Sequence, residues 1–352
     1  MQPVEEHLAR SERHTTFYLA SGPSEGSPII FLHGWPELSI SWRHQLACLA
    51  MLGFRAIAPD MRGYGRSSTY SRLEDYAIEH AVVDMLELLG SLGHERAVWV
   101  GHDWGAEVVW RIASHHPERC VGVASLCVPY LRQGFAPANL IPLADRTTYP
   151  ETEYPVAQWD YMLFYEEHFD DARRGLEANV SNTVKAFFRK GNPDGKGKPT
   201  RMATVRQRGG IFGPGGAPDL PRDEDVLPVE EWRKYTAALE YTGFFGANAW
   251  YMNHRRNMEY ARLAQNGGII DLPVLFLHGE YDYTCETMQS RLAEPMRVDC
   301  SDLTEEVVQS GHWMAQEKPI DVNAALVRWL ATRFPELWRA GPEVSGGPVR
   351  ND

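Results

Sequence analysis

The chain has 352 residues, of which 43% are hydrophobic and 23% charged, so it can bury a large core in the manner of an ordinary globular protein. Its formal net charge of −12 gives no electrostatic reason to bind phosphate backbones or anionic lipid surfaces, so we expect no nucleic-acid partner. No apolar run approaches the roughly 18 residues of a membrane span, and the opening residues lack the apolar core of a secretion signal.

Short apolar segments that alternate with helical patterns predict a mostly parallel sheet with helices on both faces. Each segment is flanked by Gly, Pro or Asp, as buried strands usually are. A helical pattern over residues 76–92 lies between the second and third segments and ends at Gly93. The expected strands cover residues 28–32, 54–58, 97–100, 121–128 and 273–277.

The alternation of strands and helices stops near residue 131 and resumes near residue 263. Residues 131–262 are rich in aromatic side chains and arginine and contain two Gly/Pro-rich loops, so we interpret them as a helical cap inserted into the core. The core would then consist of residues 1–130 and 263–339, and residues 340–352 would form a flexible tail.

The segment AVWVGHDWG, residues 97–105, places an aspartate where an expected strand passes into a helix. This is the context of the nucleophile elbow G-x-S-x-G, with Asp103 at the serine position. Gly101 and Gly105 permit a turn tight enough to expose the central side chain. Asp103 would alternatively be only a helix N-cap, but a cap requires neither two flanking glycines nor partners further along the chain.

Candidate partners follow in the order nucleophile, acid, histidine. Asp282 lies in HGEYD, after the expected strand 273–277, and is therefore placed at the carboxyl edge of the sheet, with Glu280 as the alternative acid. His312 lies in the loop sequence Ser-Gly-His-Trp after a short β-prone stretch. The ordered set of three predicts a site for covalent catalysis.

The loop after the first expected strand reads His-Gly-Trp-Pro, residues 33–36. In an elbow architecture this loop faces the nucleophile, so the main-chain N–H groups of Trp35 and Trp104 are the candidate donors of an oxyanion hole. Pro36 would fix the loop, with a cis peptide bond as one way to do so.

An aspartate nucleophile attacks a different class of substrate than the serine of the usual elbow does. A carboxylate displaces a leaving group at a saturated carbon and forms an alkyl-enzyme ester. Water activated by His312, with Asp282 orienting the ring, would then hydrolyse that ester. Epoxides and haloalkanes are the two substrate classes that fit this sequence of steps.

From about residue 15 to 335 the chain resembles the soluble epoxide hydrolases of the α/β-hydrolase fold. The resemblance implies that fold with a helical cap, a small hydrophobic epoxide as substrate, and neither a cofactor nor a metal. It also implies two cap tyrosines that donate to the epoxide oxygen. By local match these are Tyr161 and Tyr251, with Tyr165, one helical turn after Tyr161, as the alternative. The resemblance rests on the cap and on HGWP (33–36), RGYGRS (62–67), GHDWG (101–105), EYD (280–282) and GHW (311–313).

Haloalkane dehalogenases share the Asp-Trp elbow and form the nearest alternative. An alkoxide leaving group needs a proton donor whereas a halide does not, and tyrosine hydroxyls are protonated at neutral pH. Dehalogenases also often carry a halide-binding side chain at the position of Trp35. The cap tyrosines therefore favour epoxides. A non-catalytic small-molecule receptor of the same fold is the third hypothesis.

The five cysteines are scattered along the chain without paired spacing. This is typical of free thiols in a reducing compartment, so we expect a cytoplasmic protein without a disulfide framework. No zinc-ligand spacing is present in the sequence.

Overall fold

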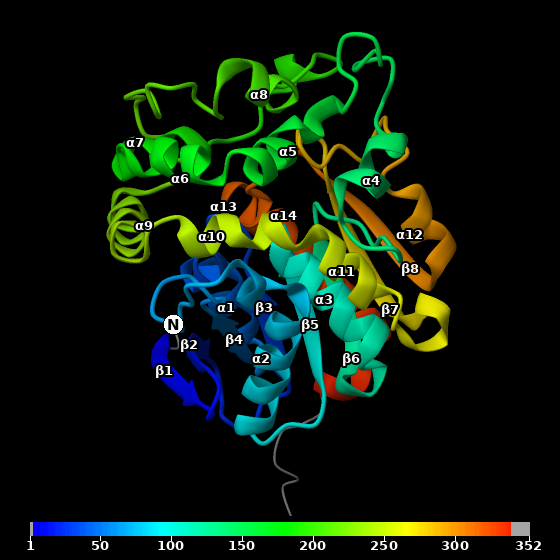
Figure 1. Cartoon of the computed structure of the whole chain (residues 1–352). Coiled ribbons are helices and arrows are strands. Elements are labelled where there is room, and N and C mark those ends of the chain that lie inside the picture. The colour runs from blue at the N-terminus through cyan, green and yellow to red at the C-terminus, as the bar shows by residue number, and fades with distance from the viewer. Residues whose placement is uncertain (1–2, 339–352) are drawn as a thin grey trace, which may run out of the picture.

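An eight-stranded sheet runs through the protein, and the computed structural model describes it within residues 3–338 (Figure 1). The strand order is β1-β2-β4-β3-β5-β6-β7-β8, with antiparallel pairing of β1 with β2 and of β2 with β4 and parallel pairing for the rest. The strands are β1 (Glu5–Arg10), β2 (Thr15–Ser21), β3 (Pro28–Leu32), β4 (Arg55–Pro59), β5 (Ala97–His102), β6 (Cys120–Leu126), β7 (Ile270–Gly279) and β8 (Cys300–Val308).

The five expected strands are confirmed as β3 to β7, and their ends shift by a few residues. Strands β1 and β2 were not predicted. They pair antiparallel at the edge of the sheet, and β1 alternates between exposed and half-buried residues instead of forming an apolar run. The parallel strands β3 to β7 are mostly buried and apolar, which is the pattern that the sequence analysis detected. Strand β8, parallel to β7 at the other edge, is partly exposed and was expected only as a short β-prone stretch.

Four long helices cover the faces of the parallel sheet. They are α1 (Arg43–Met51), α2 (Ile78–Ser91), α3 (Trp104–His115) and α14 (Pro319–Arg333). Helix α1 packs against α14, and α2 packs against α3, so the sheet is covered on both sides (Figure 1). The predicted helix ends close to where expected, since Gly93, with φ of 77°, follows α2.

The chain between β6 and β7 forms helices that lie mostly above the carboxyl ends of the strands (Figure 1). The predicted tail, residues 340–352, lies outside the described residues. None of the helices within residues 3–338 is long and apolar enough to cross a membrane. The helices above the sheet are α4 (Pro137–Leu140), α5 (Asp160–Glu167), α6 (Phe169–Glu177), α7 (Val180–Phe187), α8 (Val205–Arg208), α9 (Val229–Thr242), α10 (Phe245–Ala249) and α11 (His254–Ala261).

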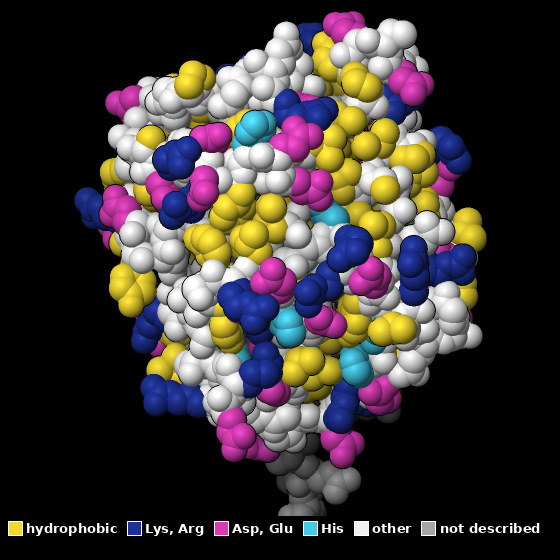
Figure 2. Space-filling view, in the orientation of Figure 1, with side chains coloured by type: hydrophobic (Ala, Val, Ile, Leu, Met, Phe, Trp, Pro, Cys, Tyr) yellow, Lys and Arg dark blue, Asp and Glu magenta, His cyan; other side chains and the backbone are white. Residues whose placement is uncertain are grey.

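Two short helices, α12 (Glu294–Asp299) and α13 (Met314–Glu317), lie between β7 and α14 in the chain. On the face shown in Figure 2, acidic and basic side chains are interspersed, and hydrophobic side chains gather in the upper half of the molecule. This half contains the helices above the sheet, which carry much of the aromatic content of the chain.

Candidate active site

Asp103 lies in a sharp turn between the end of β5 and the start of α3. Its φ and ψ are 51° and −124°. Residues other than glycine rarely adopt this backbone conformation, which is found at nucleophile elbows. The flanking glycines are required by packing: a Cβ on Gly101 would lie 2.5 Å from the Cα of Ala106, and one on Gly105 would lie 2.2 Å from the carbonyl oxygen of Leu32. The turn therefore exposes Asp103 at the edge of the sheet.

The Asp103 carboxylate does not cap its own helix. Its Oδ1 instead accepts a hydrogen bond of 2.7 Å from the main-chain N–H of Trp35, one of the two predicted oxyanion donors. The other, the N–H of Trp104, belongs to the first turn of α3, where main-chain donors lack an intrahelical acceptor. The Trp35–Pro36 peptide bond is cis, as the sequence suggested.

His312 and Asp282 meet beside this carboxylate. The Nδ1 of His312 lies 2.7 Å from Oδ2 of Asp282, and its Nε2 lies 3.7 Å from Oδ2 of Asp103. The other oxygen of Asp282 accepts main-chain hydrogen bonds from Thr284 (3.1 Å) and Cys285 (3.0 Å). The main chain thus holds Asp282 at one carboxylate oxygen, and the other oxygen contacts the His312 imidazole.

The alternative acid, Glu280, lies elsewhere. Its carboxylate is 3.8 Å from the ammonium of Lys196, and 23% of its side chain is exposed, against 1% for Asp282. The structure therefore pairs the histidine with Asp282 and turns Glu280 toward the surface.

Charge and burial oppose each other at the His312–Asp282 pair. Burial by itself would lower the pKa of His312, but the carboxylates of Asp282 and Asp103 and the hydrogen bond to Asp282 outweigh it and raise this pKa to about 9. Burial would likewise raise the pKa of Asp282, but the charge and hydrogen bond of His312 dominate and lower it to about 2. Near neutral pH the pair is an imidazolium and a carboxylate.

A cavity of about 320 Å³ opens above Asp103. The predicted Tyr161, in α5, and Tyr251, in the turn after α10, both line it, with ring centroids 5.7 Å apart. Tyr165 lines the cavity as well, 4.8 Å from the Tyr251 ring. Aromatic and ionisable side chains of the wall include Trp35, Asp103, Tyr161, Tyr165, Phe187, Tyr251, His312 and Trp313.

The three tyrosines differ in how their hydroxyls are placed. The Tyr165 hydroxyl is buried and has no hydrogen-bond partner within residues 3–338, so it is screened from a ligand in the cavity. Burial, with the nearby charge of Asp103 as a further cause, raises the pKa of Tyr161, Tyr165 and Tyr251 well above 10. All three are therefore protonated over the neutral range and can donate a proton or a hydrogen bond.

Sequence reasoning missed a buried contact between a carboxylate and an imidazole beneath the site. The carboxylate of Glu37 lies 2.7 Å from Nδ1 of His102, and it also accepts from the main-chain N–H of Gly34 (3.0 Å) and the amide of Gln316 (3.1 Å). Burial would raise the pKa of Glu37, but His102 outweighs it and lowers this pKa to about 2. Glu37 directly follows the HGWP motif and His102 lies within GHDWG, so an ionisable residue in or beside each motif was the available signal.

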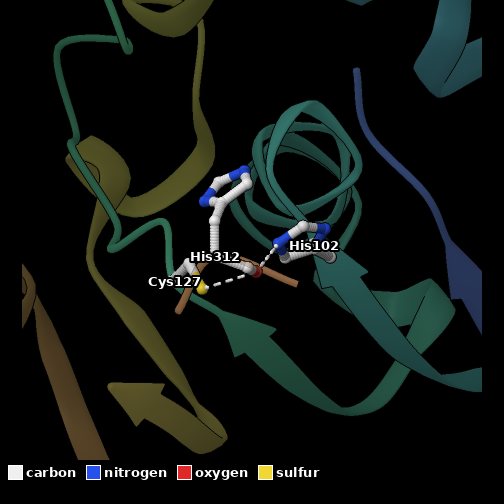
Figure 3. A group of neighbouring side chains, drawn as sticks. All are labelled: His102, Cys127 and His312. Atoms are coloured by element: carbon white, nitrogen blue, oxygen red, sulfur yellow. Dashed lines mark hydrogen bonds between the residues drawn. The ribbon is translucent and has the colours of Figure 1, made fainter. Parts of the chain in front are cut away.

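His102 and Cys127 hold the main chain of His312. Figure 3 shows both side chains directed at the His312 carbonyl oxygen, while the imidazole of His312 points away from them. The Nε2 of His102 donates to that oxygen over 2.8 Å, and the thiol of Cys127 donates over 3.4 Å. The Glu37–His102 pair thus connects the loop of residues 33–36 to the main chain of His312.

Comparison with known proteins agrees with this geometry. The α/β hydrolase fold family model matches residues 27–319. Epoxide hydrolase A of Mycobacterium tuberculosis is 37% identical over 313 residues, which cover 87% of this chain and 91% of that protein. The chain belongs to the epoxide hydrolases of the α/β-hydrolase fold. The predicted fold and family are thereby confirmed.

Other epoxide hydrolases show the extent of the similarity. Bifunctional epoxide hydrolase 2 of Rattus norvegicus is 34% identical over 90% of this chain, but the chain spans only 53% of that protein's length. Epoxide hydrolase A from Mycobacterium thermoresistibile superimposes with a TM-score of 0.75 at 30% identity, over 93% of this chain and 98% of that structure. An epoxide hydrolase from an endophytic Streptomyces gives a TM-score of 0.78 at 26% identity, over 94% and 96%.

Proposed function

We propose that this protein adds water to a small hydrophobic epoxide and releases a vicinal diol, through an ester formed on Asp103. The observation that carries the proposal is one cavity with two facing sets of groups. Asp103 and His312 lie at its floor, and the tyrosines of the helices between β6 and β7, which we treat as a cap, line its wall. Asp103 and the tyrosines serve the first step, and His312 serves the second.

In the first step an oxygen of Asp103 attacks an epoxide carbon, and the strained carbon–oxygen bond of the ring breaks. The electron pair of that bond goes to the leaving oxygen, which takes a proton from Tyr161 or Tyr251. Because both hydroxyls belong to buried groups, their hydrogen bonds to a developing alkoxide are strengthened by the low local dielectric.

In the second step His312 removes a proton from water, and the hydroxide attacks the carbonyl carbon of the Asp103 ester. The negative charge that develops on the ester oxygen is held by the N–H of Trp35, with the N–H of Trp104 as the second donor. The bond between the Asp103 carbonyl carbon and the substrate oxygen then breaks, and the diol leaves with a proton.

Ester formation also prepares His312 for this role. The Asp103 carboxylate is one of the charges that raise the pKa of His312 to about 9. Esterification removes that charge, so the pKa of the imidazolium falls and a proton becomes available to the tyrosinate left by the first step. His312 is then neutral when water must be activated.

Turnover of simple substrates tests the function directly. With styrene oxide or a terminal alkyl epoxide we expect diol formation. With a bromoalkane of similar size we expect much slower halide release, because a halide gains nothing from the proton that the tyrosines deliver to a leaving oxygen, and each such donor is worth about 10²–10³ to ring opening. Faster halide release would identify a dehalogenase, and absence of turnover with both would identify a binding protein.

The tyrosine assignment predicts a graded series. Tyr161→Phe and Tyr251→Phe should each slow ester formation by up to about 10²–10³, and the double variant should nearly abolish it. Tyr165→Phe is the matched control and should have a much smaller effect, because its hydroxyl is screened from the cavity. Ester formation is measured in rapid-quench single turnovers by the mass of the protein.

The two tyrosines should also determine the highest pH at which the ester forms. A phenolate cannot donate, but burial raises the pKa of both donors well above 10, so ester formation should persist at pH 10 and fail only above it. A loss of ester formation centred below pH 10 in the parent, retained in both single variants, would remove the tyrosines from the mechanism.

A further inference from the structure

A soft-metal ligand set lies at the floor of the cavity. A carboxylate oxygen of Asp282, the sulfur of Cys285 and a ring nitrogen of His312 all lie within 4.8 Å of one another. The first two residues come from the loop after β7 and the third from the loop after β8, so no sequence spacing announces the set.

We propose that Asp282, Cys285 and His312 form an inhibitory site for a thiophilic divalent cation such as Zn²⁺ or Cd²⁺, and that the bound ion arrests the enzyme as its Asp103 ester. The site itself stands independently of the proposed function, whereas the arrest rests on it.

The donor set matches this class of ion. One sulfur, one imidazole nitrogen and one carboxylate oxygen suit Zn²⁺ and its congeners, while Ca²⁺ and Mg²⁺ prefer oxygen ligands. Bonds of about 2.0–2.3 Å in a tetrahedral site place ligand atoms roughly 3.3–3.8 Å apart, so the three atoms need shifts of about 1 Å. A fourth position remains for water from the cavity.

The surroundings favour a cation and give it access. The carboxylate of Asp103 lies 3.7 Å from Nε2 of His312 and favours positive charge beside the site. Asp282 is already oriented, because the main-chain N–H groups of Thr284 and Cys285 occupy one of its oxygens. Asp282 and His312 both line the open cavity, so an ion can reach them from solvent.

A second group of potential ligands, His102, Cys127 and His312, is less suited to an ion. The His102 ring already contacts the Glu37 carboxylate and the His312 carbonyl, and Cys127 donates to the same carbonyl (Figure 3). Ligation there would break these contacts, whereas at the first group it replaces a single hydrogen bond between Asp282 and His312.

Ligation has a defined consequence. The ion displaces the thiol proton of Cys285 and the proton shared by His312 and Asp282, and both are released to solvent. The oriented base is lost, so water cannot be activated, but Asp103 and the tyrosines are untouched. An enzyme loaded with the ion should therefore open one epoxide per chain and stop.

Metal binding is tested first, without substrate. Titration of the purified protein with Cd²⁺ should produce a Cd²⁺–thiolate charge-transfer band that saturates at one ion per chain and disappears with EDTA. Cys285→Ser should lose the band and weaken binding by at least the 10–100-fold typical of a disturbed metal site. Cys48→Ser, which removes the half-buried thiol, and Cys127→Ser, which removes the thiol of the second ligand group, should keep it. Absence of the band in the parent, or its persistence in Cys285→Ser, would overturn the site.

The arrest is tested next, on protein saturated with Cd²⁺ and given excess styrene oxide. We expect a burst of one epoxide consumed per chain and a protein mass increased by one substrate, with turnover restored by EDTA. Inhibition without the mass increase overturns the arrest. If the metal-free protein does not turn over any epoxide, it is the proposed function that fails, while the Cd²⁺ band still decides the site.

Discussion

Replacing Asp103 with asparagine should lower epoxide turnover by more than about 10⁴, the scale of losing a catalytic nucleophile. The amide side chain has nearly the same shape and keeps an oxygen for the N–H of Trp35, so the elbow should remain folded. It carries no charge with which to attack carbon. Diol formation is measured at saturating epoxide, and circular dichroism and thermal unfolding check the fold.

Isotope labelling separates a covalent role of Asp103 from general-base catalysis by the same carboxylate. With enzyme in excess over epoxide in ¹⁸O-water, the first diol should be unlabelled, since its new oxygen comes from Asp103. The label should enter the carboxylate and reach the diol only in later turnovers. Label in the first diol would show that water attacks the epoxide directly.

The elbow could be predicted from the sequence because its determinants are local. A strand, two glycines and a helix follow one another within the segment 97–115, and the close approach of Gly105 to the carbonyl of Leu32 shows why a side chain is excluded there. The acid and the histidine could be predicted because each follows a strand whose carboxyl end lies at the same edge of the sheet.

The remaining features depend on contacts that no local pattern records. Strand β1 has no apolar run because its residues are only exposed or half-buried, and it is held by pairing with β2. Strand β2 is largely buried, but its position in the sheet depends on pairing with β4, which lies 34 or more positions further along the chain. Glu37 and His102 are 65 positions apart and become a pair only when the loop of residues 33–36 packs against the elbow in the folded chain. The sequence placed Tyr161 and Tyr165 on one helical face, and only packing screens the hydroxyl of Tyr165.

The imidazole of His312 should be needed for the second step and not for the first. His312→Gln should still form the ester, because Asp103 keeps its contact with Trp35 and the tyrosines still supply the proton. Without a base, hydrolysis of that ester should slow by at least about 10²–10⁴. Mass spectrometry after exposure to epoxide should therefore find the protein heavier by one substrate.

Two controls give this outcome its meaning. His116→Gln makes the same change at a half-exposed histidine remote from the cavity and should turn over without accumulating an adduct. Asp282→Asn should accumulate the ester as His312→Gln does, whereas Glu280→Gln, which removes the neighbouring acid that faces Lys196, should not. If His312→Gln yields neither adduct nor diol, the imidazole acts before ester formation. The imidazolium that Asp103 helps to stabilise would then be part of the ring-opening step, and the division of labour between the floor of the cavity and its tyrosine wall would have to be reversed.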